Sequence, residues 1–163
     1  MNHNDTTADH EVVIVRTLGA PRELVFKAFT DPVHLAKWWG CNACTCTFHE
    51  VDIRPGGMWR FTMHVTGGVD FPNLVKFTEV IEPERLEYEH SLENENGQDK
   101  FNVVITFEVL GNKTRLTMRS IFRSAAIRDL MVKQYGVIEG GNQTIDRLEQ
   151  ELLKMKPIFI NQS

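Results

Sequence analysis

Apolar and polar residues alternate with a period of two over most of the chain, the pattern expected of β-strands that bury one face. Turn-forming pairs such as Gly67-Gly68 and Gly111-Asn112 interrupt the alternation. The alternating segments predict seven strands, over residues 11–18, 45–53, 58–65, 73–81, 85–91, 101–109 and 114–122. Because short turns join most of them, we expect an antiparallel meander.

A different period, alternating between three and four residues, predicts a long amphipathic helix near the end of the chain. Its apolar stripe comprises Ile138, Gly141, Ile145, Leu148, Leu152 and Met155, and Pro157 is expected to end it. Shorter helices are predicted from Ala20-Pro21, after Asp31-Pro32, and within 124–134. Strands and helices in this order indicate an α+β domain in which the stripe packs on one face of the sheet.

Gly141 interrupts the apolar stripe and follows a second glycine, Gly140. Glycine inside a helix costs roughly 0.8–1 kcal/mol relative to alanine. One interpretation is that the missing side chain opens space between helix and sheet. The other is that the helix begins only at Asn142, a residue type suited to an N-cap. The sequence leaves both interpretations open.

The chain has 163 residues, which suits a single domain with a real core. We expect residues 1–10 to form a flexible tail, 11–157 the domain, and 158–163 a C-terminal tail. A net charge of −4 argues against nucleic acid or an anionic membrane as a partner. No apolar run approaches the ~20 residues that span a bilayer, and the first ten residues lack a signal-peptide core. With an odd number of cysteines, these features favour the reducing cytoplasm.

Four potential metal ligands, Cys41, Cys44, Cys46 and His49, fall within nine residues. A structural zinc site usually draws its ligands from two separated segments. Here Cys44 and Cys46 share one face of a predicted strand while His49 points to the opposite face. We therefore expect no metal and no cofactor, and interpret the cysteines as buried or partly exposed thiols; a metal or redox role stays open.

Strand parity brings aromatic residues together on one face of the predicted sheet. Trp59, Phe61 and Met63 share a face of one strand, and Tyr88 and His90 share a face of another. His90 is thus the best candidate for a polar group inside an apolar cavity. The alternative is that His90 only satisfies a backbone carbonyl or lies at the wet end of its strand.

Several short segments are distinctive by their order and spacing from about residue 11 to residue 153. They are 20–32, Trp38-Trp39-Gly40, the turn Arg54-Pro55-Gly56-Gly57, Glu82-Pro83-Glu84-Arg85-Leu86, 113–117, and Ile145-Asp146-Arg147-Leu148. In these segments the chain resembles the START-like (SRPBCC) superfamily, in the branch named for homology to activators of the ninety-kilodalton heat-shock protein ATPase. The resemblance implies a helix-grip fold, a curved antiparallel sheet wrapped around a long C-terminal helix with an apolar cavity between them.

The resemblance and the absence of nucleophile, phosphate or dinucleotide motifs favour a soluble binding module over an enzyme. Its expected partner is a small apolar or aromatic molecule, and a homodimer is left open. The residues expected to bind the ligand are Trp39, Trp59, Phe61, Met63, Phe77, Tyr88, His90, Val103, Ile105, Met118, Gly141, Ile145 and Leu148. One alternative is a cyclase, aromatase or dehydratase in which His90 and Tyr88 handle protons. Another is a co-chaperone that stimulates a heat-shock ATPase.

Overall fold

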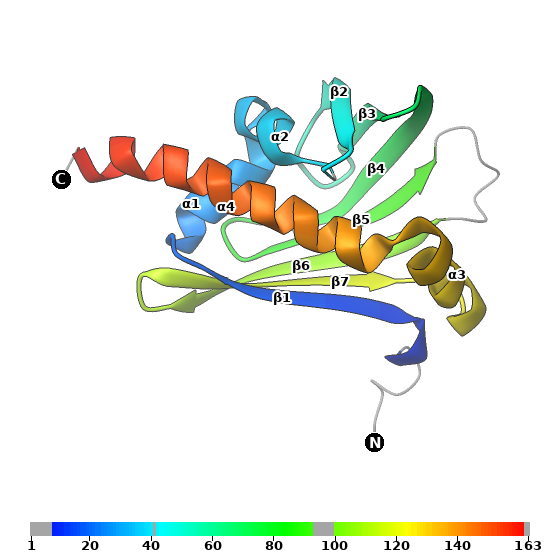
Figure 1. Ribbon diagram of the computed structural model, residues 1–163. Helices are drawn as coiled ribbons and strands as arrows, with labels where there is room; N and C mark the ends of the chain where they lie inside the picture. Colours follow the sequence, from blue (N-terminus) through cyan, green and yellow to red (C-terminus); the bar gives the residue numbers. More distant parts are fainter. Residues whose placement is uncertain (1–7, 41, 93–99, 162–163) are drawn as a thin grey trace.

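The computed structural model describes residues 8–40, 42–92 and 100–161 of the chain. They form an antiparallel sheet of seven strands in the order β1-β7-β6-β5-β4-β3-β2, with the long helix α4 crossing its concave face (Figure 1). This α+β helix-grip architecture confirms the fold expected from the sequence. The strands are β1 Glu11–Leu18, β2 Cys44–Val51, β3 Met58–Val65, β4 Val69–Ile81, β5 Arg85–Leu92, β6 Phe101–Leu110 and β7 Lys113–Ile121.

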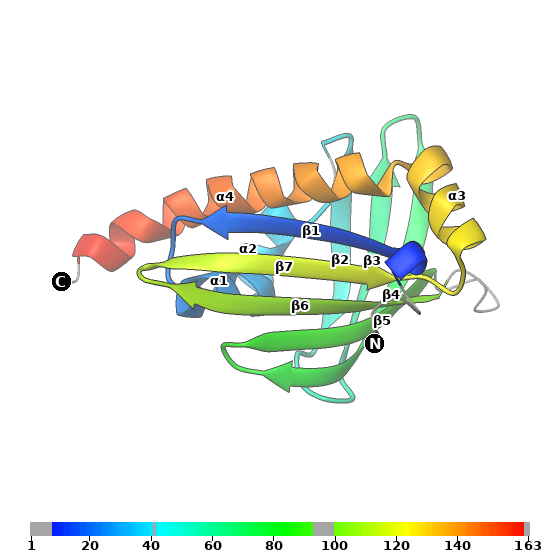
Figure 2. The same ribbon diagram turned by 90° about the horizontal axis from the view of Figure 1, so that it is seen from below.

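The chain meanders from β2 to β7, and β1 then closes one side of the sheet by pairing with β7. Strand β1 therefore lies at an edge, beside α4 when the molecule is seen from below (Figure 2). The other edge is β2. Within the stretch expected as an N-terminal tail, Ala8–His10 form a short 3-10 helix that leads into β1.

Helix α4, Val137–Asn161, is held by the apolar stripe that the sequence predicts. Ile145, Leu148, Leu152 and Met155 are all buried in the core. The expected end at Pro157 is wrong, because the helix continues to Asn161. A proline removes its own backbone hydrogen bond and crowds the carbonyl four residues before it, which disfavours a helix but does not forbid one whose preceding turns are already fixed on the sheet.

Helices α1, Arg22–Thr30, and α2, Pro32–Trp38, close one end of the space between α4 and the sheet. Asp31 joins them, since its side chain accepts a hydrogen bond from the Val33 amide at 3.0 Å and so caps α2. The Trp38 ring is completely buried against Phe29, and its N–H donates to the Ala28 carbonyl at 2.9 Å. This end of the molecule is sealed.

The β2–β3 turn has the chemistry that its sequence predicts. Gly56 has φ +84°, and a Cβ on Gly57 would collide with the Asp52 carbonyl oxygen. Asp52 and Arg54 pair beside the turn, with Arg54 Nε 2.9 Å from an Asp52 carboxylate oxygen. Because the pair is exposed at the surface, it contributes little to stability.

Helix α3, Ala125–Tyr135, lies at the opposite end from α1 and α2 (Figure 1). Ser124 caps it by accepting from the Ile127 amide at 3.1 Å, and Gly136, at φ +60°, ends it before α4 begins at Val137. Because α4 starts at Val137, the interpretation in which the last helix begins at Asn142 is wrong.

Gly141 is where α4 comes closest to β1. A Cβ at this position would lie 2.5 Å from Ile14 Cδ1, whereas a Cβ on Gly140 would meet no atom within 4 Å. The glycine therefore does not leave an empty space, because the Ile14 side chain of β1 fills it. Close approach of helix and strand is the physical reason for this residue.

The contact makes the two glycines testable as a matched pair. Gly140→Ala should raise the free energy of unfolding by roughly 0.5–1 kcal/mol, because it improves helix propensity without a clash. Gly141→Ala should be less favourable than Gly140→Ala by about 1 kcal/mol, since Ile14 must leave its rotamer. Urea denaturation of the two variants measures the difference.

A double-mutant cycle identifies the cause. Ile14→Val deletes the Cδ1 atom, so in that background Gly141→Ala should stabilise the protein as much as Gly140→Ala does. Equal stabilisation by both glycine substitutions in the parent chain would contradict the close contact.

Candidate functional site

The residues expected to bind a ligand come together between α4 and the sheet. Most of them are at most 3% exposed: Trp59, Phe61, Phe77, Tyr88, Val103, Ile105, Ile145 and Leu148. Trp39 is also buried, and Met63 and Met118 are partly buried against the same cluster. His90 packs on this cluster through Phe61 and Tyr88, while Gly141 lies apart from it, in contact with Ile14.

The two ends of this interior differ in exposure. Beside α1 and α2 the inner side chains are sealed, but beside α3 several inward-facing residues remain partly exposed. They are Ile14, Met63, His90, Phe101, Met118 and Ser120. Helix α3 contributes no buried residue of its own. Among the described residues, the inner face of the sheet is therefore least covered at the α3 end.

His90 is the polar centre of this less covered region. Its Nε2 lies 2.8 Å from Asn73 Oδ1, and Asn73 in turn donates through Nδ2 to the Phe71 carbonyl at 2.9 Å. Because the Asn73 amide nitrogen is used there, Oδ1 accepts and the proton of neutral His90 lies on Nε2. Nδ1 is then the acceptor. The partner of His90 is therefore the Asn73 side chain and not a backbone carbonyl.

Aromatic rings surround His90 and control its charge. Its ring centroid is 5.0 Å from that of Phe101 and 6.1 Å from that of Phe61. Burial lowers the pKa of His90 to about 4, since the charged imidazolium loses its hydration. The imidazole is therefore neutral at pH 7.

Two further polar groups lie in the same interior. The Trp59 indole N–H is buried and has no hydrogen-bond partner among the described residues. Its ring lies 5.7 Å from that of Tyr88, measured between centroids. Burial raises the pKa of the Tyr88 hydroxyl, so the phenol stays protonated. The site thus offers neutral donors and one neutral acceptor.

Four residues of this region are absent from the predicted set: Ile14, Asn73, Phe101 and Ser120. The two polar ones belong to inward-facing series, Asn73 with Phe71 and Val75 on β4, and Ser120 with Leu116 and Met118 on β7. The two-residue alternation that places Met118 on the inner face also places Ser120 there, so the sequence pattern could have identified Ser120. Asn73 and Ser120 were passed over because they are polar.

The cysteine segment differs from the expected set of thiols. Cys44 is disulfide-bonded, so the thiol expected there is wrong, whereas Cys46 is a free thiol as expected. Burial raises the pKa of Cys46 to about 11, against the lowering effect of the nearby Arg147 charge. Cys41 lies outside the described residues. His49 bonds Thr62 at 2.9 Å instead of turning toward the cysteines.

Side chains that could hold a metal do not gather in the part of the chain that the structure describes. No three His, Cys, Asp or Glu residues come together there. None of the helices in residues 8–40, 42–92 and 100–161 is long and apolar enough to cross a membrane.

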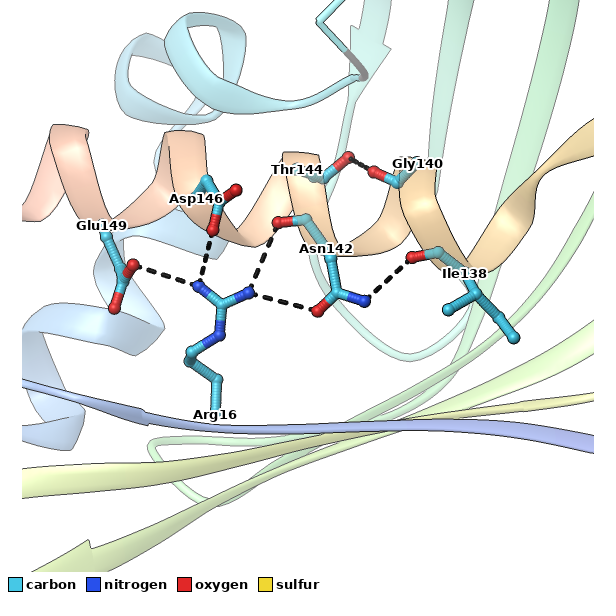
Figure 3. A network of polar contacts seen from close by, with 7 residues as sticks. All are labelled: Arg16, Ile138, Gly140, Asn142, Thr144, Asp146 and Glu149. Atoms are coloured by element: carbon cyan, nitrogen blue, oxygen red, sulfur yellow. Dashed lines mark hydrogen bonds and ion pairs between the residues drawn. The ribbon is translucent and has the colours of Figure 1, made fainter.

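A separate hollow of about 310 Å³ lies at the edge of the sheet, and the sequence did not predict it. It is lined by Val12, Val13, Ile14, Val15, Arg128, Ile138 and Asn142. Beside it, Arg16 of β1 clamps α4 through Asn142, Asp146 and Glu149, with its shortest contact 2.8 Å from Asp146 Oδ1 (Figure 3). Asn142 also donates to the Ile138 carbonyl at 3.0 Å.

Comparisons with known proteins agree with this architecture. The family model described as Activator of Hsp90 ATPase homolog 1-like protein matches residues 19–153. No curated protein matches the chain.

Solved structures of bacterial proteins share the fold. A Nitrosomonas europaea protein is 27% identical with a TM-score of 0.79, covering 92% of this chain and 98% of its own. An Arthrobacter aurescens protein is 24% identical with a TM-score of 0.83, covering 91% and 88%. The AHSA1 protein of Silicibacter pomeroyi is 18% identical with a TM-score of 0.73, covering 89% and 99%.

The buried imidazole predicts a pH dependence of stability. Above about pH 6.5 His90 is neutral in the folded and unfolded chains, so it has no effect. Between pH 6.5 and about 4 the unfolded chain binds a proton that folded His90 refuses, so stability falls as the pH is lowered. His90→Gln removes this effect. Between pH 7 and pH 5 the free energy of unfolding should therefore fall by roughly 1–2 kcal/mol more in the parent than in His90→Gln.

Urea denaturation of the two proteins at both pH values measures this difference. His49→Gln is a control, because His49 lies on the exposed face of the sheet. An NMR titration in which the His90 ring protonates near pH 6.5 would contradict the assignment.

Proposed function

The chain belongs to the Activator of Hsp90 ATPase homolog 1-like family, and we propose that it is a binding module for a small apolar or aromatic molecule. The ligand would lie between α4 and the sheet, at the end beside α3. The observation that supports this proposal is the partial exposure of inward-facing Met63, Phe101 and Met118, whereas the inner face beside α1 and α2 is sealed.

The apolar part of the ligand is favoured by the walls. Met63, Phe101 and Met118 present apolar surface that a ligand would remove from water, worth roughly 25 cal/mol for each Å² buried. Methionine side chains also adapt their shape to different partners, because they are unbranched and polarizable. These residues suit a ligand that is recognised by shape and apolar contact.

The polar part of the ligand is expected to be uncharged. His90 and Tyr88 are both neutral at pH 7 because burial shifts each pKa toward the neutral form. A charged group without a partner would be costly among these aromatic rings. A hydroxyl group, by contrast, could donate to His90 Nδ1.

Binding of Nile red, an uncharged dye that fluoresces in apolar surroundings, tests the proposal. The parent protein should bind the dye saturably, near one molecule per chain. Met118→Trp fills the proposed space and should weaken binding about tenfold or more. Thr117→Trp is the matched control, because Thr117 is the neighbour of Met118 on β7 and faces the other side of the sheet.

Circular dichroism establishes that both variants are folded. Native mass spectrometry of freshly purified protein would show whether a compound is carried along. Equal dye affinity of the parent and of folded Met118→Trp would contradict the proposal. The proposal would also be contradicted if the parent binds no dye but stimulates a purified Hsp90 ATPase, and Met118→Trp stimulates it equally.

A further inference from the structure

The hollow at the edge of the sheet shares only Ile14 with the less covered region around His90. Its walls come from three elements, with Val12 to Val15 from β1, Arg128 from α3, and Ile138 and Asn142 from α4. Its volume of about 310 Å³ is at the lower end of the roughly 300–1,000 Å³ typical of small-molecule sites. A small ligand would therefore fill it.

Strand β1 presents unpaired backbone groups to this hollow. The Phe122 amide donates to the His10 carbonyl at 3.0 Å, and the same register pairs Val12 with Ser120 and Ile14 with Met118. In an antiparallel ladder, alternate residues direct their N–H and C=O groups to the partner strand. The intervening residues Val13 and Val15 therefore direct theirs to the free edge, where no described strand pairs with them.

Arg128 confirms this geometry and supplies a charge. Its Nε donates to the Glu11 carbonyl at 3.0 Å, so the guanidinium lies on the free edge of β1. Nη1 contacts Asp129, whose side chain is 53% exposed, at 3.3 Å. Nη2 has no partner among the described residues. Along the edge, the group that follows the Glu11 carbonyl is the Val13 N–H.

The remaining walls combine apolar side chains with the polar Asn142, and they are firmly held. Val12 is buried, and Ile14 and Ile138 are partly buried. Asn142 is fixed by its bonds to Arg16 and to the Ile138 carbonyl, as Figure 3 shows. The hollow thus has a cationic group at one end and the apolar side chains of Val12, Ile14 and Ile138 along part of its walls.

We propose that this hollow binds a small monocarboxylate with an aliphatic or aryl tail. The Arg128 Nη2 and the Val13 N–H would donate to the carboxylate, and Val12, Ile14 and Ile138 would cover the tail. One guanidinium and one amide suit a single negative charge. Asp129 and the net charge of −4 disfavour a polyanion such as a phosphorylated ligand. The proposal does not rest on binding at His90.

An NMR titration of the methyl-labelled protein with hexanoate tests it. The methyl signals of Val12, Ile14 and Ile138 should shift saturably, and those of Met63 and Met118 should not. Arg128→Gln should weaken binding about tenfold or more, because it removes the charge. Arg115→Gln is the control, since Arg115 is exposed on β7 and does not line the hollow. Hexanol, which lacks the carboxylate, should bind weakly and with the same affinity to the parent and to Arg128→Gln.

A second pair of variants tests the backbone donor. Val13→Pro removes the N–H proposed to hold the carboxylate, and Val15→Pro removes the next N–H on the same edge. Proline is tolerated in an edge strand where its nitrogen faces away from the ladder, and the two valine side chains are similarly exposed, at 50% and 55%. Only Val13→Pro should weaken hexanoate binding.

The outcomes separate the alternatives. Shifts that report Val12, Ile14 and Ile138 and vanish in Arg128→Gln support the site. Absence of shifts at millimolar hexanoate overturns it, as does equal affinity of Arg128→Gln and the parent. Shifts confined to Met63 and Met118 also overturn it, and assign hexanoate to the interior beside His90. If the proline variants fail to fold, the comparison of Arg128→Gln with Arg115→Gln still decides.

Discussion

The burial of one amphipathic helix against one curved sheet is the constraint on which the rest of this structure depends. The stripe of Ile145, Leu148 and Leu152 seats α4 on the concave face, and full burial of each such side chain is worth about 1.5–3 kcal/mol. Polar contacts then fix the helix along its length. Arg16 holds the first half to β1, and His34 of α2 lies 2.7 Å from the buried carboxylate of Glu151 in the second half.

A single straight helix cannot cover a curved sheet evenly, and the two ends of the interior show the consequence. At one end α1 and α2 add aromatic and aliphatic side chains that complete the core. At the other end α3 adds none, so the inner residues of β3, β5, β6 and β7 remain partly exposed. The well-packed core thus lies at the end beside α1 and α2, and the more exposed part of the interior lies at the end beside α3.

The sequence predicts what depends on local period. Strand parity alone places Trp59, Phe61, Tyr88 and His90 on one face, and the three-and-four spacing predicts the buried stripe of α4. The local pattern does not predict contacts between segments that are distant in the sequence. Nothing near Gly141 indicates that Ile14 fills its space, and nothing near Val13 indicates a hollow, because that hollow needs β1, α3 and α4 together. The continuation of α4 beyond Pro157 also departs from the local preference of that residue.

One buried polar group, the indole N–H of Trp59, does not contribute to stability through a hydrogen bond to any described residue. A buried donor without a partner costs roughly 1–3 kcal/mol, and the Trp59 N–H is such a donor. Phenylalanine at this position would avoid that cost and still pack against Phe77 and Tyr88. Tryptophan at this position thus fills more of the core than phenylalanine would, at the cost of one unsatisfied donor. Packing volume and hydrogen bonding are in conflict at Trp59, and the fold keeps the volume.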